Sequence, residues 1–190
     1  VVQMKKILLF VASFLMLFVC GCHNTHSEQI ADLAQWITYD QIVLGRTDVE
    51  MLEALHGQPT EKDVFDNGVQ VVCYEGYHFI AEDDAVKTIV IENSAAPPLW
   101  DAISVGDSLD TLLSVLPVAP LEMEYDIDFP PSELSESEEE LYCVLITTYE
   151  GDISQKYSKE LLFVISRKYV FTFQIDTECD TITEIDLMGG

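Results

Sequence analysis

The chain has 190 residues, of which 48% are hydrophobic, and its 34 acidic residues against 9 basic ones give a formal net charge of −25. Such a charge repels nucleic acid and anionic lipid head groups, so it argues against proteins that act by binding either of them. The hydrophobic content is enough for a core that does not depend on disulfide bonds.

The N-terminus has the features of a secretory signal. Lys5 and Lys6 precede an apolar run at residues 7–19 that is interrupted only by Ser13, and this order matches the charged and hydrophobic regions of such signals. Thirteen residues do not span a bilayer, because a helix rising about 1.5 Å per residue needs roughly 20 of them. We therefore expect residues 1–21 to be a cleaved signal peptide rather than a membrane anchor.

The apolar run ends in Val19-Cys20-Gly21-Cys22, which resembles the bacterial lipobox. Signals of that kind are cut before the last cysteine, so the resemblance implies that Cys22 carries the lipid. Two or three acyl chains hold a protein on a membrane far better than one. We expect an exported protein on the outer face of the plasma membrane in a Gram-positive host, or at the outer membrane in a Gram-negative host. The alternative is an ordinary soluble secreted protein.

The charge of the mature chain indicates the kind of partner. Cleavage would remove two of the nine basic residues and no acidic residue, leaving a formal charge of −27, and no Lys or Arg occurs between Lys87 and Lys156. The negative electrostatic field of such a chain favours a cationic partner. We therefore expect the partner to be an extracytoplasmic protein, and a basic one would suit this charge. The alternative is a solvated acidic surface that binds nothing.

Two stretches of the chain match each other at a shift of 61 residues. The first residues, 22–40, are expected to be a tether and a short helix. The matched pairs that follow are Ile42 and Ile103, Gly45 and Gly106, Thr47 and Ser108, Leu52 and Leu113, Leu55 and Leu116, and Pro59 and Pro120. Both stretches predict an amphipathic helix after the glycine. Thr47 and Glu50 predict a capping box at the first helix, and Asp107 or Ser108 predicts the cap of the second.

Strand patterns follow each predicted helix. Asn67-Gly68 predicts a tight hairpin turn, followed by strands at 69–74, 77–81 and 86–91, with later strands at 141–149, 160–165, 169–175 and 182–187. An acidic insertion at about 122–140 has the composition of a loop. The predicted fold class is α+β, with two tandem units at 41–92 and 103–188 joined by a linker at 93–102. Each unit would be a short helical segment packed on its own small antiparallel β-meander.

The matched stretches also resemble a known superfamily. Residues 39–47 with Leu52, Leu55, Gly57 and Pro59, and again residues 100–108, resemble the superfamily that joins β-lactamase inhibitor proteins to SmpA/OmlA (BamE-type) envelope lipoproteins. The resemblance covers roughly residues 36–188 and implies small helix-plus-sheet units that bind other proteins. The chain departs from the family at Arg46 and Asp107, where Met is common, and neither unit has a cysteine pair such as the inhibitors use.

No pattern for catalysis, a metal or a cofactor is found. Gly106-Asp107-Ser108 lacks the second glycine of a nucleophile elbow, and Asp126-x-Asp128 lacks the Gly and distal Glu of a calcium loop. The cysteines that remain in the body of the chain, Cys73, Cys143 and Cys179, fit neither a zinc site nor a Cys-x-x-Cys redox motif. We expect a protein that is not an enzyme and has no catalytic residues, metal or cofactor.

The candidate binding residues come from the strand alternation. Tyr169, Phe171 and Phe173 alternate along one strand and so share one face, which we expect to pack against a helix. Thr172 and Gln174 then lie on the other, open face. By the same alternation Tyr74 and His78 are predicted to lie there too, and these four residues form the predicted partner-binding site.

The function predicted from the sequence is therefore a membrane-anchored extracytoplasmic lipoprotein that acts as a non-catalytic protein-binding module. The alternatives are a structural cell-envelope protein without a dedicated ligand and an inhibitor of a secreted hydrolase such as a β-lactamase. A small-molecule or ion binder is a further class.

Overall fold

The computed structural model describes residues 35–126, 141–149, 156–166 and 168–189. The predicted signal peptide, Cys22, most of the tether and most of the acidic insertion lie outside these residues. Residues Ile37–Gly190 form one compact unit. Within the described ranges, no helix has the length and hydrophobicity needed to cross a membrane.

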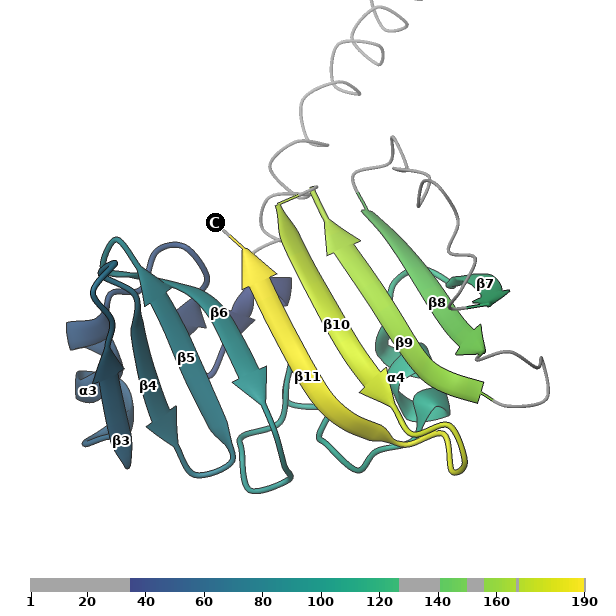
Figure 1. Ribbon diagram of the computed structural model, residues 1–190, viewed down its shortest axis with the longest axis horizontal. Helices are drawn as coiled ribbons and strands as arrows, with labels where there is room; N and C mark the ends of the chain where they lie inside the picture. The colour runs from purple at the N-terminus through teal and green to yellow at the C-terminus, as the bar shows by residue number, and fades with distance from the viewer. Residues whose placement is uncertain (1–34, 127–140, 150–155, 167, 190) are drawn as a thin grey trace, which may run out of the picture. The chain divides into compact units, whose positions relative to one another are not determined.

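Nine strands form a single broad sheet in the order β3-β4-β5-β6-β11-β10-β9-β8-β7 (Figure 1). Neighbouring strands are antiparallel, except β7 and β8, which are parallel. A small hairpin of β1 (Thr38–Tyr39) and β2 (Ile42–Val43) precedes the sheet. The strands of the sheet are β3 (Glu61–Val64), β4 (Gln70–Tyr74), β5 (Tyr77–Glu82), β6 (Ala85–Ile91), β7 (Leu121–Asp126), β8 (Leu141–Tyr149), β9 (Lys156–Ile165), β10 (Tyr169–Ile175) and β11 (Ile182–Gly189).

The predicted fold class, α+β with two tandem helix-on-meander units, is wrong. The strands predicted to close the two units, β6 and β11, pair with each other, with Ile89 opposite Leu187 and Ile91 opposite Ile185. Two separate meanders would each leave a hydrophobic edge strand with backbone groups facing solvent. Pairing these edges satisfies the backbone groups and joins the apolar residues of both strands into one layer.

The core lies on one face of this sheet. Alternate residues of its central strands are almost fully buried, namely Phe79, Ile89, Ile91, Leu161, Phe163, Phe171, Phe173, Ile185 and Leu187. Among the described residues of this compact unit there are two helices, α3 (Val49–His56) and α4 (Leu109–Val115). His56 of α3 packs on Phe79 of the core face, and α4 lies behind β9 in Figure 1. We call this side of the sheet the helix face.

The two glycines matched by the sequence have equivalent local surroundings. Gly45 N–H donates to Val86 O at 2.7 Å, and Gly106 N–H donates to Ile182 O at 2.8 Å. Their φ angles are 74° and 100°, a region that a residue with a Cβ avoids. Val86 lies near the start of β6 and Ile182 begins β11, so each glycine fixes the approach to a helix against the start of one of these two central strands.

The cap of the first helix is not the predicted one. Asp48 caps α3, with its Oδ1 accepting from Met51 N–H at 2.7 Å. Thr47 Oγ1 instead accepts from Val43 N–H at 2.9 Å, within the turn before the helix. The predicted Thr47–Glu50 capping box is therefore wrong.

In the second helix, Ser108 is the cap, as one of the two predicted alternatives had it, and its Oγ accepts from Thr111 N–H at 3.2 Å. Asp107 Oδ2 accepts from Ser104 N–H at 2.8 Å, the role that Thr47 has in the first segment. The turn after the second glycine is thus one residue shorter, and the helices correspond at a shift of 60 residues rather than 61.

The segments predicted as insertions carry part of the sheet. Residues 121–126, at the start of the predicted acidic insertion, form β7, which lies parallel to β8 at one edge. Strand β9 begins at Lys156 rather than at residue 160. Strand β7 and its parallel pairing with β8 were not predicted.

Candidate functional site: the open face of the sheet

The face opposite the helix face, here called the open face, is crossed by one continuous row of side chains. The strand registers place the residues of this row opposite one another on successive strands from β4 to β8, in the order Cys73, His78, Val90, Asp186, Thr172, Leu162 and Val144. Adjacent strands lie about 4.8 Å apart. The row therefore brings together residues from both halves of the chain.

Three of the four predicted binding residues lie on the open face. His78 and Thr172 belong to the row itself, and Gln174 lies two residues further along β10. His78 Nδ1 is 3.6 Å from Glu92 Oε1. Thr172 is only 8% exposed, so it lies between its neighbours and offers little surface to a partner.

Tyr74 lies on the helix face, and its predicted place beside His78 is wrong. The residue opposite His78 is Cys73, whereas Tyr74 is opposite Tyr77, and the rings of the two tyrosines stack at 5.4 Å. The Tyr74 hydroxyl donates to Gly57 O at 3.2 Å. A difference of one residue in register moves a side chain to the other face of a sheet, and the sequence alone does not supply that register.

The carboxylates of Glu160, Glu184 and Asp186 form a group here called the acidic patch, in which Asp186 belongs to the row and the other two lie beside it. Glu160, Gln174 and Glu184 are opposite one another on β9, β10 and β11, and Asp186 follows two residues after Glu184. Burial raises the pKa of Asp186, and Glu184 and Glu160 raise it further, while His78 acts in the opposite direction. Sequence reasoning missed these residues because only the strand pairing brings Glu160 near β11.

The negative potential continues toward β3. The pKa of Cys73 is raised by burial and then by Glu61, Glu92 and Asp63. Exposure of the face is uneven, because Met188 on β11 is 43% exposed whereas Ile146 and Val164 on β8 and β9 are buried. The accessible part of the open face is therefore centred on β6 and β11.

The raised pKa of Asp186 gives a prediction for stability. Because this carboxyl holds its proton more tightly in the folded state than the ordinary value of about 3.9, its ionisation costs stability at neutral pH. Asp186→Asn should therefore raise the free energy of unfolding at pH 7 by about 0.5 kcal/mol, a small gain since solvent screens the half-buried group.

Urea unfolding at pH 7 and at pH 3 would measure this effect of Asp186→Asn. The gain should shrink as the pH falls through the raised folded value of Asp186, and it should vanish below the unfolded value, where both states are protonated. A gain of equal size at both pH values would contradict this explanation.

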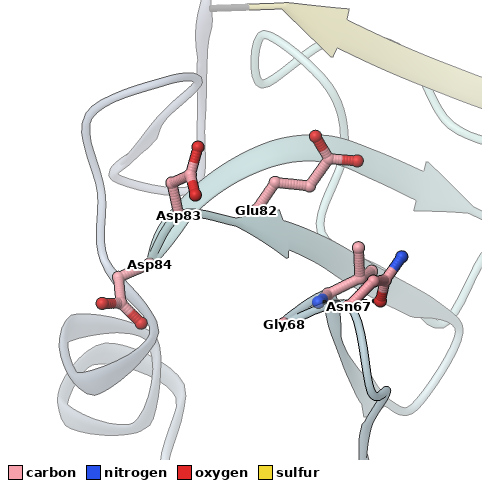
Figure 2. A pocket seen from close by; sticks show the side chains of 6 residues that line it. Asn67, Gly68, Glu82, Asp83 and Asp84 are labelled. Carbon is pink, nitrogen blue, oxygen red and sulfur yellow. Dashed lines mark hydrogen bonds between the residues drawn. The ribbon is translucent and has the colours of Figure 1, made fainter.

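A hollow of about 420 Å³ lies between the turn that joins β3 to β4 and the turn that joins β5 to β6. Figure 2 shows Asn67 and Gly68 of one turn near Glu82, Asp83 and Asp84 of the other. Gln70 Nε2 donates to Asp84 Oδ1 at 3.4 Å. Among the described residues, no group of three or more His, Cys, Asp and Glu side chains could hold a metal ion, so we assign no ligand to this hollow.

A second polar cluster lies on the helix face. His56 Nδ1 is 3.1 Å from the Tyr77 hydroxyl and 3.4 Å from Asp40 Oδ2, and the rings of Tyr74 and Phe79 lie within 6 Å of its ring. Burial first, and then Asp40, raise the pKa of Tyr77 to about 12. The rings pack directly on one another, so this cluster attaches the end of α3 to β4 and β5.

The three described cysteines are free thiols in different surroundings, and they should differ in reactivity. Cys179 is exposed in the turn between β10 and β11, whereas Cys143 is buried on β8. Burial raises the pKa of Cys143 to about 12, and the thiolate is the reactive form. A disulfide reagent such as dithiobisnitrobenzoate should label Cys179 within minutes and Cys143 only after unfolding.

Two serine variants would check this difference. Cys179→Ser should remove one equivalent of rapid labelling, and Cys143→Ser should leave the rapid phase unchanged. Rapid labelling that persists in full in the Cys179→Ser protein would contradict the assignment.

Comparison with known proteins identifies no family. No family model matches the chain, and no curated protein matches it either. The resemblance of residues 39–47 and 100–108 to the β-lactamase inhibitor proteins and SmpA/OmlA lipoproteins therefore stays a prediction.

Two solved structures share a limited similarity with the chain. An extracellular protein containing an SCP domain from Bacillus anthracis str. Ames is 12% identical with a TM-score of 0.43, over 80% of this chain and 47% of its own. A DUF4309 family protein, YjgB, from Bacillus subtilis subsp. subtilis str. 168 is 13% identical with a TM-score of 0.42, over 78% of this chain and 82% of its own. The chain spans less than half the length of the first protein. Neither similarity assigns a function.

Proposed function

We propose that the protein is an exported lipoprotein, attached to the membrane through Cys22, that binds another extracytoplasmic protein through the open face of its sheet. Binding rather than catalysis is its role. In a Gram-positive host it lies on the outer leaflet of the plasma membrane, and in a Gram-negative host at the outer membrane.

The observation that supports this proposal most is the composition of the open face. Around the exposed Met188, apolar residues such as Val90 alternate with His78, Glu184 and Asp186. An apolar centre with polar and charged groups around it is the usual anatomy of a protein–protein interface. The helix face, in contrast, is filled by the core.

Site-specific photo-crosslinking would test the binding role. A photoreactive residue placed at Met188, on the open face, should crosslink a protein of defined mass in intact cells. The matched control is Met51, which is 50% exposed on α3 and should give no such product. Equal products from both positions, or none from Met188, would contradict the proposal.

The anchor is tested separately by Cys22→Ser. Losing the acyl chains removes most of the hydrophobic contribution to membrane binding, which is about 0.8 kcal/mol per buried methylene. Because serine lacks the thiol that would carry the lipid, the variant should lose incorporation of labelled fatty acid and bind the membrane less. Labelling that persists in Cys22→Ser would exclude Cys22 as the lipid attachment site.

A further inference from the structure

The spacing of the acidic patch defines the ligands that it suits. Glu160 and Glu184 lie two strands apart, which places their backbones roughly 10 Å apart. Glu184 and Asp186 are two residues apart on β11, or about 7 Å along the strand. Calcium needs its oxygen ligands at 2.3–2.6 Å from one ion, so a patch this wide does not suit a single cation.

An extended polypeptide has the complementary spacing. Side chains at positions i and i+2 of a strand point to the same side and are also about 7 Å apart. Two lysine or arginine side chains with that spacing could therefore meet Glu184 and Asp186 together. A third cation further across the sheet would reach Glu160.

The apolar neighbours of the patch suit such side chains as well. Val90 lies opposite Asp186 on β6, and Met188 is exposed two residues further along β11. Lysine and arginine lay their methylene stems on apolar surface and keep the charged head in water. The open face thus offers apolar area for the stems beside carboxylates for the heads.

The charges of the chain point to the same partner. The formal net charge is −25, and two of its lysines already pair with acidic residues of the chain. Lys159 Nζ is 2.7 Å from Asp180 Oδ1, and Lys62 Nζ is 2.9 Å from Glu53 Oε1. Burial first, and then Glu184 and Glu160, raise the pKa of Asp186, so its negative charge lies where a cationic side chain would stabilise it.

We infer that the open face takes a basic polypeptide segment, whose lysine or arginine side chains pair with Glu184, Asp186 and Glu160 while their stems pack on Val90 and Met188. This inference rests on the proposed function and names the chemistry of the partner. Complementary charge of this kind mainly sets the rate and specificity of association.

A labelled peptide of alternating lysine and valine would test the inference against the full-length chain in detergent. Fluorescence anisotropy should show saturable binding, and a glutamate–valine peptide should not bind. The variant Glu184→Gln/Asp186→Asn should weaken binding of the lysine peptide at least tenfold. The matched control Asp83→Asn/Asp84→Asn, which removes the same charge at the turn hollow, should change it less than twofold.

Several results would overturn the inference. Equal loss of affinity in the two double variants would show attraction by net charge alone, and unchanged affinity in the patch variant would exclude the patch. A failure here differs from a failure of the proposed function. If Met188 still crosslinks a protein whose yield does not respond to Glu184→Gln/Asp186→Asn, the binding role stands and only the basic partner is excluded.

Discussion

Val90→Pro should lower the free energy of unfolding by about 4 kcal/mol or more, which is among the largest effects expected of one substitution. Val90 lies in β6 with His78 of β5 on one side and Asp186 of β11 on the other. Proline removes the backbone donor and is found in sheets essentially only at edges or bulges. The β6–β11 pairing has only four opposed residue pairs, so the loss of one backbone hydrogen bond removes a large share of it.

Urea unfolding followed by far-UV circular dichroism would measure this loss, with Val64→Pro as the matched control. Val64 lies in β3 at the edge of the sheet and is 66% exposed. Phe65 N–H donates to Val69 O, and the alternation of antiparallel bonds leaves the Val64 N–H on the free edge. The control should lose less than about 1 kcal/mol. Equal losses in the two variants would contradict a continuous sheet through β6 and β11.

Phe171→Ala should lower the free energy of unfolding by about 3–5 kcal/mol, the range found when a buried aromatic ring is removed. Phe171 has no exposed surface on the helix face of β10. Its ring centroid lies 5.6 Å from that of Trp100 and 5.8 Å from that of Phe163. The substitution leaves a cavity among these rings, and the surrounding sheet relaxes only in part.

Tryptophan fluorescence during urea unfolding would report the loss directly, because Trp100 is one of the rings around the cavity. The matched control is Phe65→Ala, since Phe65 is 53% exposed after β3 and its removal should cost less than about 1 kcal/mol. If Phe171→Ala were as stable as this control, the aromatic core would be wrongly placed.

Several local features could be predicted from the sequence, because nearby residues decide them. Asn67-Gly68 predicted a hairpin turn, and Gly68 has a φ of 84° between β3 and β4. The alternation around Phe171 and Phe173 correctly placed them in the core and placed Thr172 and Gln174 on the opposite face. Each of these features follows from a period of two or from a backbone conformation that only certain residues adopt.

The arrangement of the sheet could not be predicted in this way. Nothing near Ile89 in the chain states that it lies opposite Leu187, and both strands have the same apolar pattern whether they close two meanders or one sheet. The parallel pairing of β7 with β8 was missed for a different reason. Acidic residues such as Glu122 and Glu124 are typical of a loop, so no strand was predicted there.

Local sequence was enough to place some residues of the candidate site, whereas others depend on strand pairing. Alternation within β10 was enough to place Gln174, whereas Tyr74 was assigned to the wrong face, because its side depends on the register with β5. The acidic patch could not be predicted from the sequence, because Glu160 and Glu184 are brought together only by the pairing of β9 and β11 with β10.

By itself the sequence determined the turn at Asn67-Gly68 and the alternation of faces within single strands, together with a negative charge that follows from composition. Tertiary structure alone decided that β6 pairs with β11, that Tyr74 lies on the helix face, and that three distant carboxylates share one surface. The physical reason is the distance along the chain over which each kind of interaction acts. Backbone sterics and side-chain alternation act over a few residues, whereas strand order and register are chosen by the burial and hydrogen bonding of the whole sheet.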